Sequence, residues 1–210
     1  MPRQRRSSSK RRNEANPLSH SPVGWYMRFL PHFDGGEISQ SVTFRLADSL
    51  PRQCIEVCQT VRQGSTPTDA ARIYYRRVER YLDQGLGSCH LRERRIASLV
   101  QDALRFFDGS RYQLHVWVVM PNHVHALFTP MEGYSPSRII HSWKSYTATA
   151  ANKILGRSGP FWQREYHDRF IRDDVHFCQA AYYIEENPVK AGLCATREKW
   201  PFSSAYGRES

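Results

Sequence analysis

The chain has 210 residues, a length that favours one domain with a substantial core, and its hydrophobic content of 40% excludes a fully disordered chain. No apolar run approaches the ~20 residues that a membrane-spanning helix needs, so we expect no membrane partner. The formal net charge of +10 favours a polyanionic partner such as nucleic acid, because neutralised phosphates release counterions. The five cysteines are scattered, and no apolar leader is apparent, so we expect a cytoplasmic location.

The first half of the chain is predicted to begin with a tail and continue mainly as helices. Residues 1–22 are basic and rich in Ser, Asn and Pro, which predicts a disordered tail before a single domain over 23–210. A turn is expected at 32–36. Residues 41–46 alternate, with Val42, Phe44 and Leu46 on one side, which is typical of a strand. Helices are predicted over 51–62, 67–83 and 91–107 from capping residues and apolar spacing.

The second half is predicted to contain a hairpin and two further helices. Residues 112–120 and 123–128 form two strands joined at Pro121-Asn122, a helix follows over 136–155, and 165–171 is an extended edge segment. Asp173-Asp174 cap a helix that we expect to end near Glu186, because the residue before Pro188 is pushed away from helical angles. This order predicts an α+β fold: a ferredoxin-like βαββαβ antiparallel sheet with helices mainly on one face and an inserted helical pair at about 64–92.

Two histidines in the second strand of the hairpin are candidate metal ligands. His123 and His125 lie two residues apart, so their imidazoles project from the same side of a strand. Two neighbouring imidazoles are a plausible pair of ligands for a divalent cation. An isolated H-x-H pattern is weak, however, and two histidines on a half-exposed strand explain it equally simply.

The last helix offers a third ligand and a nucleophile in two alternative pairs. Residues four apart share a helix face, which pairs Tyr183 with Asn187 and Tyr182 with Glu186. Chemistry alone slightly favours Glu186, because a carboxylate suits Mg²⁺ or Mn²⁺ better than an amide. The simpler interpretation is that Tyr182 and Tyr183 are structural aromatic residues, in the core or at its boundary, and take no part in chemistry.

Several sequence blocks together resemble a known family. Their order is V-T-F-R-L at 42–46, V-V-M-P-N-H-V-H-A-L-F at 118–128, H-S-W-K-S-Y at 141–146, F-W-Q-R-E-Y at 161–166, I-R-D at 171–173, Y-I-E-E-N-P-V-K-A-G-L at 183–193 and W-P-F-S-S at 200–204. These blocks are similar to the single-tyrosine HUH transposases of insertion-sequence type, in particular to the REP-associated tyrosine transposases. The resemblance spans most of residues 40–205 and is far more specific than the H-x-H pattern.

The resemblance implies a role for each residue of the candidate site. His123 and His125 are the expected metal ligands, Tyr183 the nucleophile and Asn187 the third ligand, which reverses the preference for Glu186. The implied activity is metal-dependent nicking and rejoining of hairpin-bearing single-stranded DNA through a 5′-phosphotyrosine, with Mg²⁺ or Mn²⁺ as cofactor. We expect a bacterial, nucleoid-associated protein and favour a monomer over a homodimer. The alternatives are a regulatory protein that binds hairpin DNA without cutting it and, less favoured, a nuclease for RNA hairpins.

Other side chains were considered for DNA contact and for support of the site. A basic groove with stacking aromatics is the general way to hold a single strand. The candidates for backbone contact are Arg138, Lys144, Lys153, Arg157, Arg164, Arg169 and Arg172. Trp143 and Trp162 are possible stacking platforms, although we favour core positions for both. His115 is a possible support for the ligands, and Cys54 with Cys58 lack a second pair that would suggest zinc.

Overall fold

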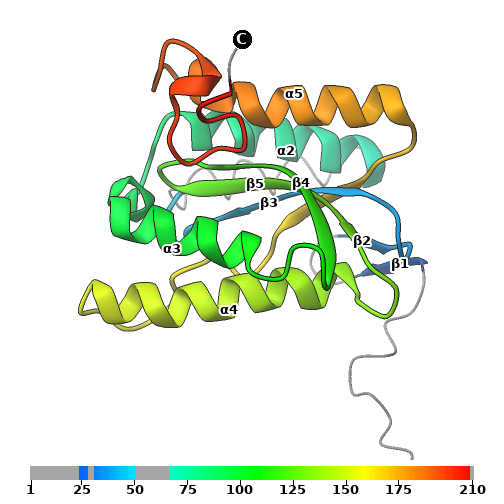
Figure 1. The fold of residues 1–210 in the computed structure, drawn as a ribbon, viewed down its shortest axis with the longest axis horizontal. Helices are drawn as coiled ribbons and strands as arrows, with labels where there is room; N and C mark the ends of the chain where they lie inside the picture. Colours follow the sequence, from blue (N-terminus) through cyan, green and yellow to red (C-terminus); the bar gives the residue numbers. More distant parts are fainter. Residues whose placement is uncertain (1–23, 28–30, 51–66, 209–210) are drawn as a thin grey trace, which may run out of the picture.

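The computed structural model describes residues 24–27, 31–50 and 67–208 and centres on a four-stranded antiparallel sheet (Figure 1). The strand order is β4-β5-β3-β6, with bounds β3 Gln40–Arg45, β4 Tyr112–Val119, β5 His123–Pro130 and β6 His167–Phe170. The predicted 165–171 segment is thus the edge strand β6, and the predicted hairpin is β4 with β5. The antiparallel α+β fold class is confirmed.

A second, two-stranded sheet precedes the main one. It pairs β1, Gly24–Met27, with β2, Pro31–Asp34, in antiparallel register. The prediction of a turn over 32–36 was wrong for its first three residues. They pair with β1, and only Gly35 and Gly36 remain outside the strand.

Helices cover both faces of the sheet (Figure 1). Their bounds are α2 Pro67–Asp83, α3 Arg94–Arg105, α4 Pro136–Ile154 and α5 Asp174–Lys190, with short 3-10 turns η2 His90–Arg92 and η3 Arg197–Lys199. α3 and α4 lie together on one face, while α5 crosses the other beside α2. The expectation of helices mainly on one face therefore describes α3 and α4, and α5 adds a layer that it did not include.

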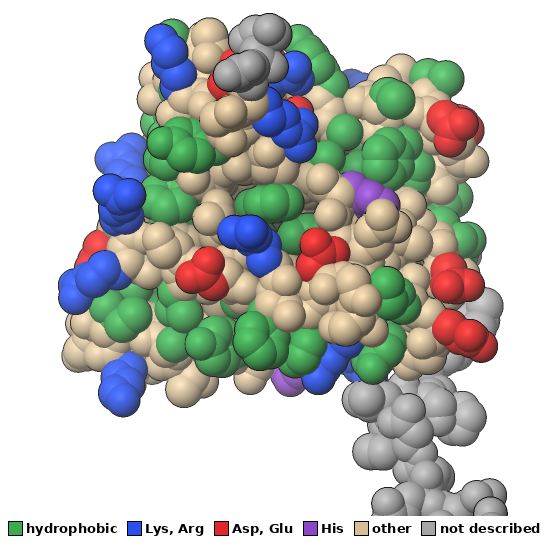
Figure 2. All heavy atoms as spheres, in the orientation of Figure 1, with side chains coloured by type: hydrophobic (Ala, Val, Ile, Leu, Met, Phe, Trp, Pro, Cys, Tyr) green, Lys and Arg blue, Asp and Glu red, His purple; other side chains and the backbone are tan. Residues whose placement is uncertain are grey.

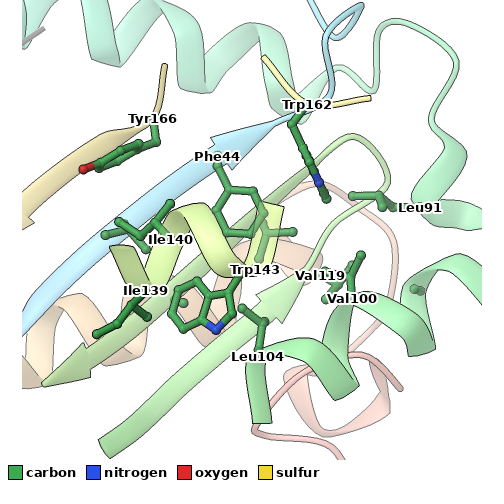
Figure 3. Close-up of a cluster of buried hydrophobic side chains, with 14 of the residues drawn as sticks. Phe44, Leu91, Val100, Leu104, Val119, Ile139, Ile140, Trp143, Trp162 and Tyr166 are labelled. Carbon is green, nitrogen blue, oxygen red and sulfur yellow. The ribbon is translucent and has the colours of Figure 1, made fainter. Parts of the chain in front are cut away.

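The main core lies between the sheet and the α3–α4 layer, where alternate strand residues point (Figure 3). Phe44 of β3 and Phe128 of β5 pack against Trp143 of α4, with ring centroids 6.5 and 5.0 Å away. The Trp143 indole N–H donates to the Tyr112 hydroxyl at 2.8 Å, which satisfies the polar group of a fully buried ring. Because strand side chains alternate, the neighbours of these residues in sequence project toward α5 instead.

Helix boundaries differ from the predictions by more than one residue in two helices, α3 and α5. α2 has the predicted bounds, whereas the helix predicted over 91–107 spans only Arg94–Arg105, after Cys89 takes a left-handed conformation and Glu93 an extended one. The helix predicted over 51–62, the tail over 1–22 and both Cys54 and Cys58 lie outside the described residues. The inserted segment at about 64–92 is described from residue 67 onward.

The end of α5 corrects a second boundary. The helix was expected to stop near Glu186, but it continues through Pro188 to Lys190. A proline lacks the N–H for its own helical hydrogen bond and crowds the carbonyl four residues earlier, and here this cost falls in the last turn. The later amides still bond backward, since Ala191 N donates to Asn187 O at 2.9 Å. The helix ends at Lys190, and Gly192, two residues later, has a φ of +69° that suits glycine. The Tyr183 face of the helix therefore gains one more turn than expected.

Candidate active site

The two histidines of β5 lie next to each other on the face of the sheet that α5 covers. Their ring centroids are 4.7 Å apart, and the rings are nearly perpendicular. Both are buried, with 1% and 2% of their surfaces exposed. Nδ1 of His123 donates to Asn122 Oδ1 at 2.7 Å, and Nδ1 of His125 is 2.7 Å from Thr43 Oγ1. These partners fix both rings and leave Nε2 as the nitrogen of each that can coordinate a cation.

The surroundings keep both imidazoles neutral. Burial, and to a smaller extent the nearby Lys190 ammonium, lower the pKa of His125 to about 3. Burial and the neighbouring His125 ring hold the pKa of His123 well below its usual range. Neutral imidazole is the form that coordinates metals, so near neutral pH both rings are in the ligating form.

α5 brings Tyr183 over the histidine pair. The Tyr183 ring lies 5.8 Å from the His125 ring, centroid to centroid. Asn187, one turn further on, is 1% exposed, and its Nδ2 donates to the Tyr183 carbonyl oxygen at 2.7 Å. That hydrogen bond fixes the amide and leaves its Oδ1 as the atom that can accept or coordinate.

The alternative pair on the same helix points elsewhere. Tyr182 is 58% exposed, and its ring lies 5.7 Å from the guanidinium carbon of Arg197, in η3. A carboxylate oxygen of Glu186 is 3.9 Å from the Nε of the same arginine. Tyr182 and Glu186 therefore face the C-terminal segment, and the structure places Tyr183, not Tyr182, against His125.

The phenol of Tyr183 is held in its protonated form. Burial raises the pKa of Tyr183 far above its usual range, with further contributions from the carboxylates of Glu79 and Asp83. The Lys190 ammonium lies 4.5 Å from the centre of the Tyr183 ring. A protonated phenol is a poor nucleophile, so an attack by Tyr183 requires a group that takes its proton.

Three further polar residues of the sheet lie beside the histidines and were missed by sequence reasoning. In the strand register Arg45 of β3 lies opposite His123, and Thr43 lies opposite both His125 of β5 and His167 of β6. Burial lowers the pKa of His167 to about 3, so this imidazole is also neutral. The alternation of residues 41–46 was a signal for Thr43 and Arg45, whereas His167 required the pairing of β3 with β6.

Lys190 and Glu79 are the other missed neighbours. Lys190 lies seven residues after Tyr183, which is the same helix face and a signal that the sequence contains. Glu79 belongs to the inserted helix α2, and its carboxylate contributes to the raised pKa of Tyr183. No sequence pattern indicates that link, because it depends on how α2 packs against α5.

The donors at this site suit a divalent cation held by few protein ligands. Within the residues that the structure describes, no group of three or more His, Cys, Asp or Glu side chains is arranged to hold a metal ion. Two neutral imidazole nitrogens and the Asn187 amide oxygen would supply three neutral donors. A cation bound in this way keeps positions for phosphate oxygens and water, as Mg²⁺ and Mn²⁺ do.

The candidate DNA-binding side chains are divided between the two faces of the molecule. Arg138, Lys144 and Lys153 lie on α4, on the face opposite Tyr183. Lys144 donates to the Arg164 carbonyl at 2.7 Å, and Arg157 contacts His90 at 2.8 Å. On the face drawn in Figure 2 the Lys and Arg side chains are spread out, with acidic and apolar side chains between them.

Only the β6 end of the candidate set approaches the tyrosine. The charge of Arg169 acts on both Glu79 and His167, which places this guanidinium on the α5 side. Arg172 follows two residues after β6, and its backbone N–H donates to the His176 ring at 3.3 Å. Of the seven predicted cations, Arg169 is therefore the one for which the structure gives an electrostatic link to the Tyr183 site.

The remaining candidates have structural roles. Trp143 and Trp162 are 2% and 6% exposed and point into the core, so neither can stack on a base (Figure 3). His115 Nε2 lies 2.7 Å from Thr129 Oγ1, and its ring packs on Phe177 at 5.1 Å. Those contacts tie His115 to the far end of β5, not to the ligand pair. Among the described residues, no helix has the length and apolar character to cross a membrane.

Comparisons with known proteins match the part of the chain that contains the candidate residues. The family model "Transposase IS200 like" matches residues 93–187, a segment that includes both histidines, Tyr183 and Asn187. The chain is 30% identical over 97 residues to a REP-associated tyrosine transposase of Escherichia coli (strain K12), a match to 45% of this chain and 55% of that protein. It is 29% identical over 98 residues to a putative REP-associated tyrosine transposase of Haemophilus influenzae, a match to 42% of this chain and 56% of the relative.

A solved structure supports the fold. It is described as a REP-associated tyrosine transposase bound to a REP hairpin, and it matches with a TM-score of 0.51 and 18% identity, over 85% of this chain and 82% of that one. The two curated relatives are matched over only about half of their own length. The motif resemblance is confirmed: residues 93–187 match the model of the IS200-like transposases, and the chain is similar to two REP-associated tyrosine transposases.

Proposed function

We propose that the chain is a metal-dependent transposase that nicks and rejoins hairpin-bearing single-stranded DNA through a covalent bond to Tyr183. The observation that carries the proposal is the position of Tyr183, 5.8 Å from the His125 ring on a helix that covers the histidine pair. His123, His125 and Asn187 would hold the cation, and Tyr183 would be the nucleophile. A bound Mg²⁺ or Mn²⁺ would polarise the scissile phosphate and stabilise the charge that develops on it.

The chemical step is an in-line transesterification. The phenolic oxygen of Tyr183 attacks the phosphorus, the bond to the 3′ oxygen breaks, and a 5′-phosphotyrosine and a free 3′-OH result. The covalent bond conserves the phosphodiester linkage, so a 3′-OH can later attack it and join two strands without ATP. Thr43 and Asn122 would keep the two histidines in the orientation that this chemistry needs.

The proposed substrate follows from chemistry and from the relatives. The net charge of +10 suits a polyanion, and a solved relative is bound to a REP hairpin. The expectations of a monomer and of a cytoplasmic, nucleoid-associated location stay predictions. Light scattering of the purified chain, with and without a hairpin oligonucleotide, would test the first.

The test uses a pool of DNA hairpins with random single-stranded segments at the base of each stem. These DNAs are incubated with the full chain and MnCl₂ or MgCl₂. Denaturing gels should show a protein–DNA adduct with the parent and with Tyr182→Phe, and none with Tyr183→Phe. We expect EDTA, or His123→Ala with His125→Ala, to lower adduct formation by at least ~10³-fold. An equal adduct yield from Tyr183→Phe would contradict the proposal.

The alternative functions are separated by the same reagents. Tight hairpin binding by the parent without an adduct in either metal would favour a protein that binds hairpin DNA without cutting it. Cleavage of the RNA version of a hairpin, with the DNA version left intact, would favour an RNA nuclease. The phosphotyrosine bond itself distinguishes the proposed function from both.

A further inference from the structure

The inserted segment returns to the sheet beside the candidate metal ligands. Asn122 donates from Nδ2 to the carbonyl oxygen of Leu86, which follows α2, at 3.0 Å. The other end of the same amide, Oδ1, is 2.7 Å from Nδ1 of His123. Asn122 is fully buried, where polar groups need partners from the protein. One amide therefore joins the insert to a candidate ligand.

The chemistry of these two hydrogen bonds fixes their direction. A carbonyl oxygen can only accept, so the amide must turn its Nδ2 toward Leu86 and its Oδ1 toward His123. An amide oxygen also only accepts, which requires Nδ1 of His123 to carry the proton. In the neutral ring Nε2 then keeps the lone pair that a metal ion needs.

His125 provides a contrast within the same site. Its Nδ1 is 2.7 Å from the hydroxyl oxygen of Thr43. A hydroxyl can donate or accept, so this contact is compatible with the proton on either ring nitrogen of His125. Of the two candidate histidine ligands, His123 is therefore the one whose tautomer follows from its hydrogen-bond partner.

The loop that carries the Leu86 carbonyl is closely packed. A Cβ at Gly87 would lie 2.5 Å from the Asp48 carbonyl oxygen, and φ there is +85°, so the position requires glycine. Ser88 N donates to an Asp48 carboxylate oxygen at 2.9 Å. These contacts with the segment after β3 hold the Leu86 carbonyl in place beside Asn122.

The backbone of the hairpin turn is held by other bonds. Leu46 N donates to the Asn122 carbonyl oxygen at 2.9 Å, and Leu91 N donates to the Pro121 carbonyl oxygen at 3.2 Å. The turn between β4 and β5 therefore has supports that do not involve the Asn122 side chain. A change of that side chain can alter the contact with His123 without removing these supports.

We propose that the insert sets the tautomer of His123, with the Leu86 carbonyl orienting the Asn122 amide and the amide holding the proton on Nδ1. The inference rests on the proposed function, because it concerns a ligand of the same metal site. The charge of the ring does not change, only the nitrogen that carries its proton. Imidazole in water favours the proton on Nε2, the nitrogen that the cation needs. Asn122 is thus a positioning residue that acts through His123.

The first measurement is made on the metal-free chain. Two-bond proton–nitrogen NMR spectra of the full chain, labelled with ¹⁵N at histidine, distinguish protonated from unprotonated ring nitrogens, and the spectrum of His123→Gln assigns the signals. We expect the parent to carry the His123 proton on Nδ1. Asn122→Leu, which has a similar size and neither polar group, should shift the signals toward the Nε2–H form. Asn122→Asp, whose two oxygens both accept, should retain the parent tautomer.

The second measurement tests the loop through the affinity for Mn²⁺, measured by calorimetric titration. Gly87→Ala must move the loop, whereas its control Gly133→Ala has a similar φ of +82° and nothing within 4 Å of the added Cβ. Hydrogen bonds that orient a histidine ligand typically change metal affinity ~10–100-fold. Gly87→Ala and Asn122→Leu should therefore bind Mn²⁺ at least ~10-fold more weakly than the parent, and Gly133→Ala should bind like the parent. Gly87→Ala should have no further effect in Asn122→Asp, because an aspartate needs no orientation by the carbonyl.

The outcomes separate this inference from folding and from the proposed function. Thermal unfolding reports whether each variant folds. Asn122→Ala replaces Asn122→Leu if the latter does not fold, and Asp48→Ala, which removes the acceptor of Ser88 N, replaces Gly87→Ala.

The inference is wrong if His123 carries its proton on Nε2 in the parent or keeps it on Nδ1 in Asn122→Leu. It is also wrong if Gly87→Ala binds Mn²⁺ as Gly133→Ala does, or loses as much affinity in Asn122→Asp as in the parent. In each case a DNA adduct that depends on Tyr183 would leave the proposed function standing. If the parent neither binds Mn²⁺ nor forms an adduct, the proposed function fails, whatever the tautomer of His123.

Discussion

The two faces of the central sheet use the same alternation of side chains for opposite purposes. Toward α3 and α4, Phe44, Val124 and Phe128 are buried against Trp143. Toward α5, His123 and His125, which flank Val124 in sequence, are as deeply buried but polar. Neighbouring residues of one strand thus belong to a core on one side and to a candidate active site on the other.

The comparison separates stability from chemistry. Burial of apolar surface stabilises the α3–α4 face, since each large side chain contributes about 1.5–3 kcal/mol. Burial of the histidines keeps them neutral, and it costs stability whenever they would otherwise be protonated. Changes on the first face should therefore alter folding, and changes on the second should alter pH dependence and ligand binding.

The largest expected effect is on the apolar face. Trp143→Ala should lower the free energy of unfolding by about 3–5 kcal/mol, because it leaves a cavity next to Phe44 and Phe128. Urea denaturation measures the change. Tyr146→Ala, on the same helix but 60% exposed, is the control and should stay within about 0.5 kcal/mol of the parent. Equal losses in both variants would mean that α4 is not packed as described.

The second prediction concerns acid stability of the histidine face. The pKa of His125 is about 3 in the folded chain and 6.5 when exposed, so below pH 6.5 the unfolded chain binds a proton that the folded chain does not. Stability should fall by about 1.4 kcal/mol per pH unit for this residue, between pH 6 and pH 4. Comparing urea midpoints of metal-free parent and His125→Gln should show a shallower fall in the variant. His141→Gln, exposed on α4, should retain the parent slope. A slope in His125→Gln as steep as that of the parent would contradict the assignment.

The smallest effect compares cations on the two faces. Arg169→Gln, on the side of Tyr183, should weaken binding of single-stranded DNA about five-fold near 0.1 M salt and reduce the salt slope by about 0.7. Arg138→Gln, on α4, should change the affinity less than about two-fold, because α4 covers the opposite face. Fluorescence anisotropy over a salt series measures both. A larger loss in Arg138→Gln would place the DNA on the α4 side.

Local patterns were sufficient for most of the fold and for part of the site. The spacing of Ile96, Val100 and Leu104 predicted α3, and the alternation around Phe44 predicted β3. The short connection at Pro121-Asn122 predicted the hairpin that presents the histidines. These features depend on neighbours in sequence, where periodicity is a direct signal.

The features that were missed depend on tertiary packing. The rule for the residue before a proline predicted that α5 ends near Glu186. The helix instead continues to Lys190, and Asn187 and Pro188 are both buried in it. Glu79 acts on the pKa of Tyr183 only because α2 lies beside α5, and α2 belongs to an insertion that the sequence could delimit but not place. The choice between Tyr182 and Tyr183 likewise required the resemblance, because both sit on one helix with a polar partner four residues later.

The two hydrogen bonds of the Asn122 amide limit how the insert can be shortened. Deleting the insert would leave Nδ2 of Asn122 without the Leu86 carbonyl, and the side chain could then rotate away from His123. A shortened version would need a replacement acceptor for that N–H, supplied by a designed turn after β3. The insert can therefore be shortened, provided that a carbonyl oxygen remains in place to accept from Asn122 Nδ2.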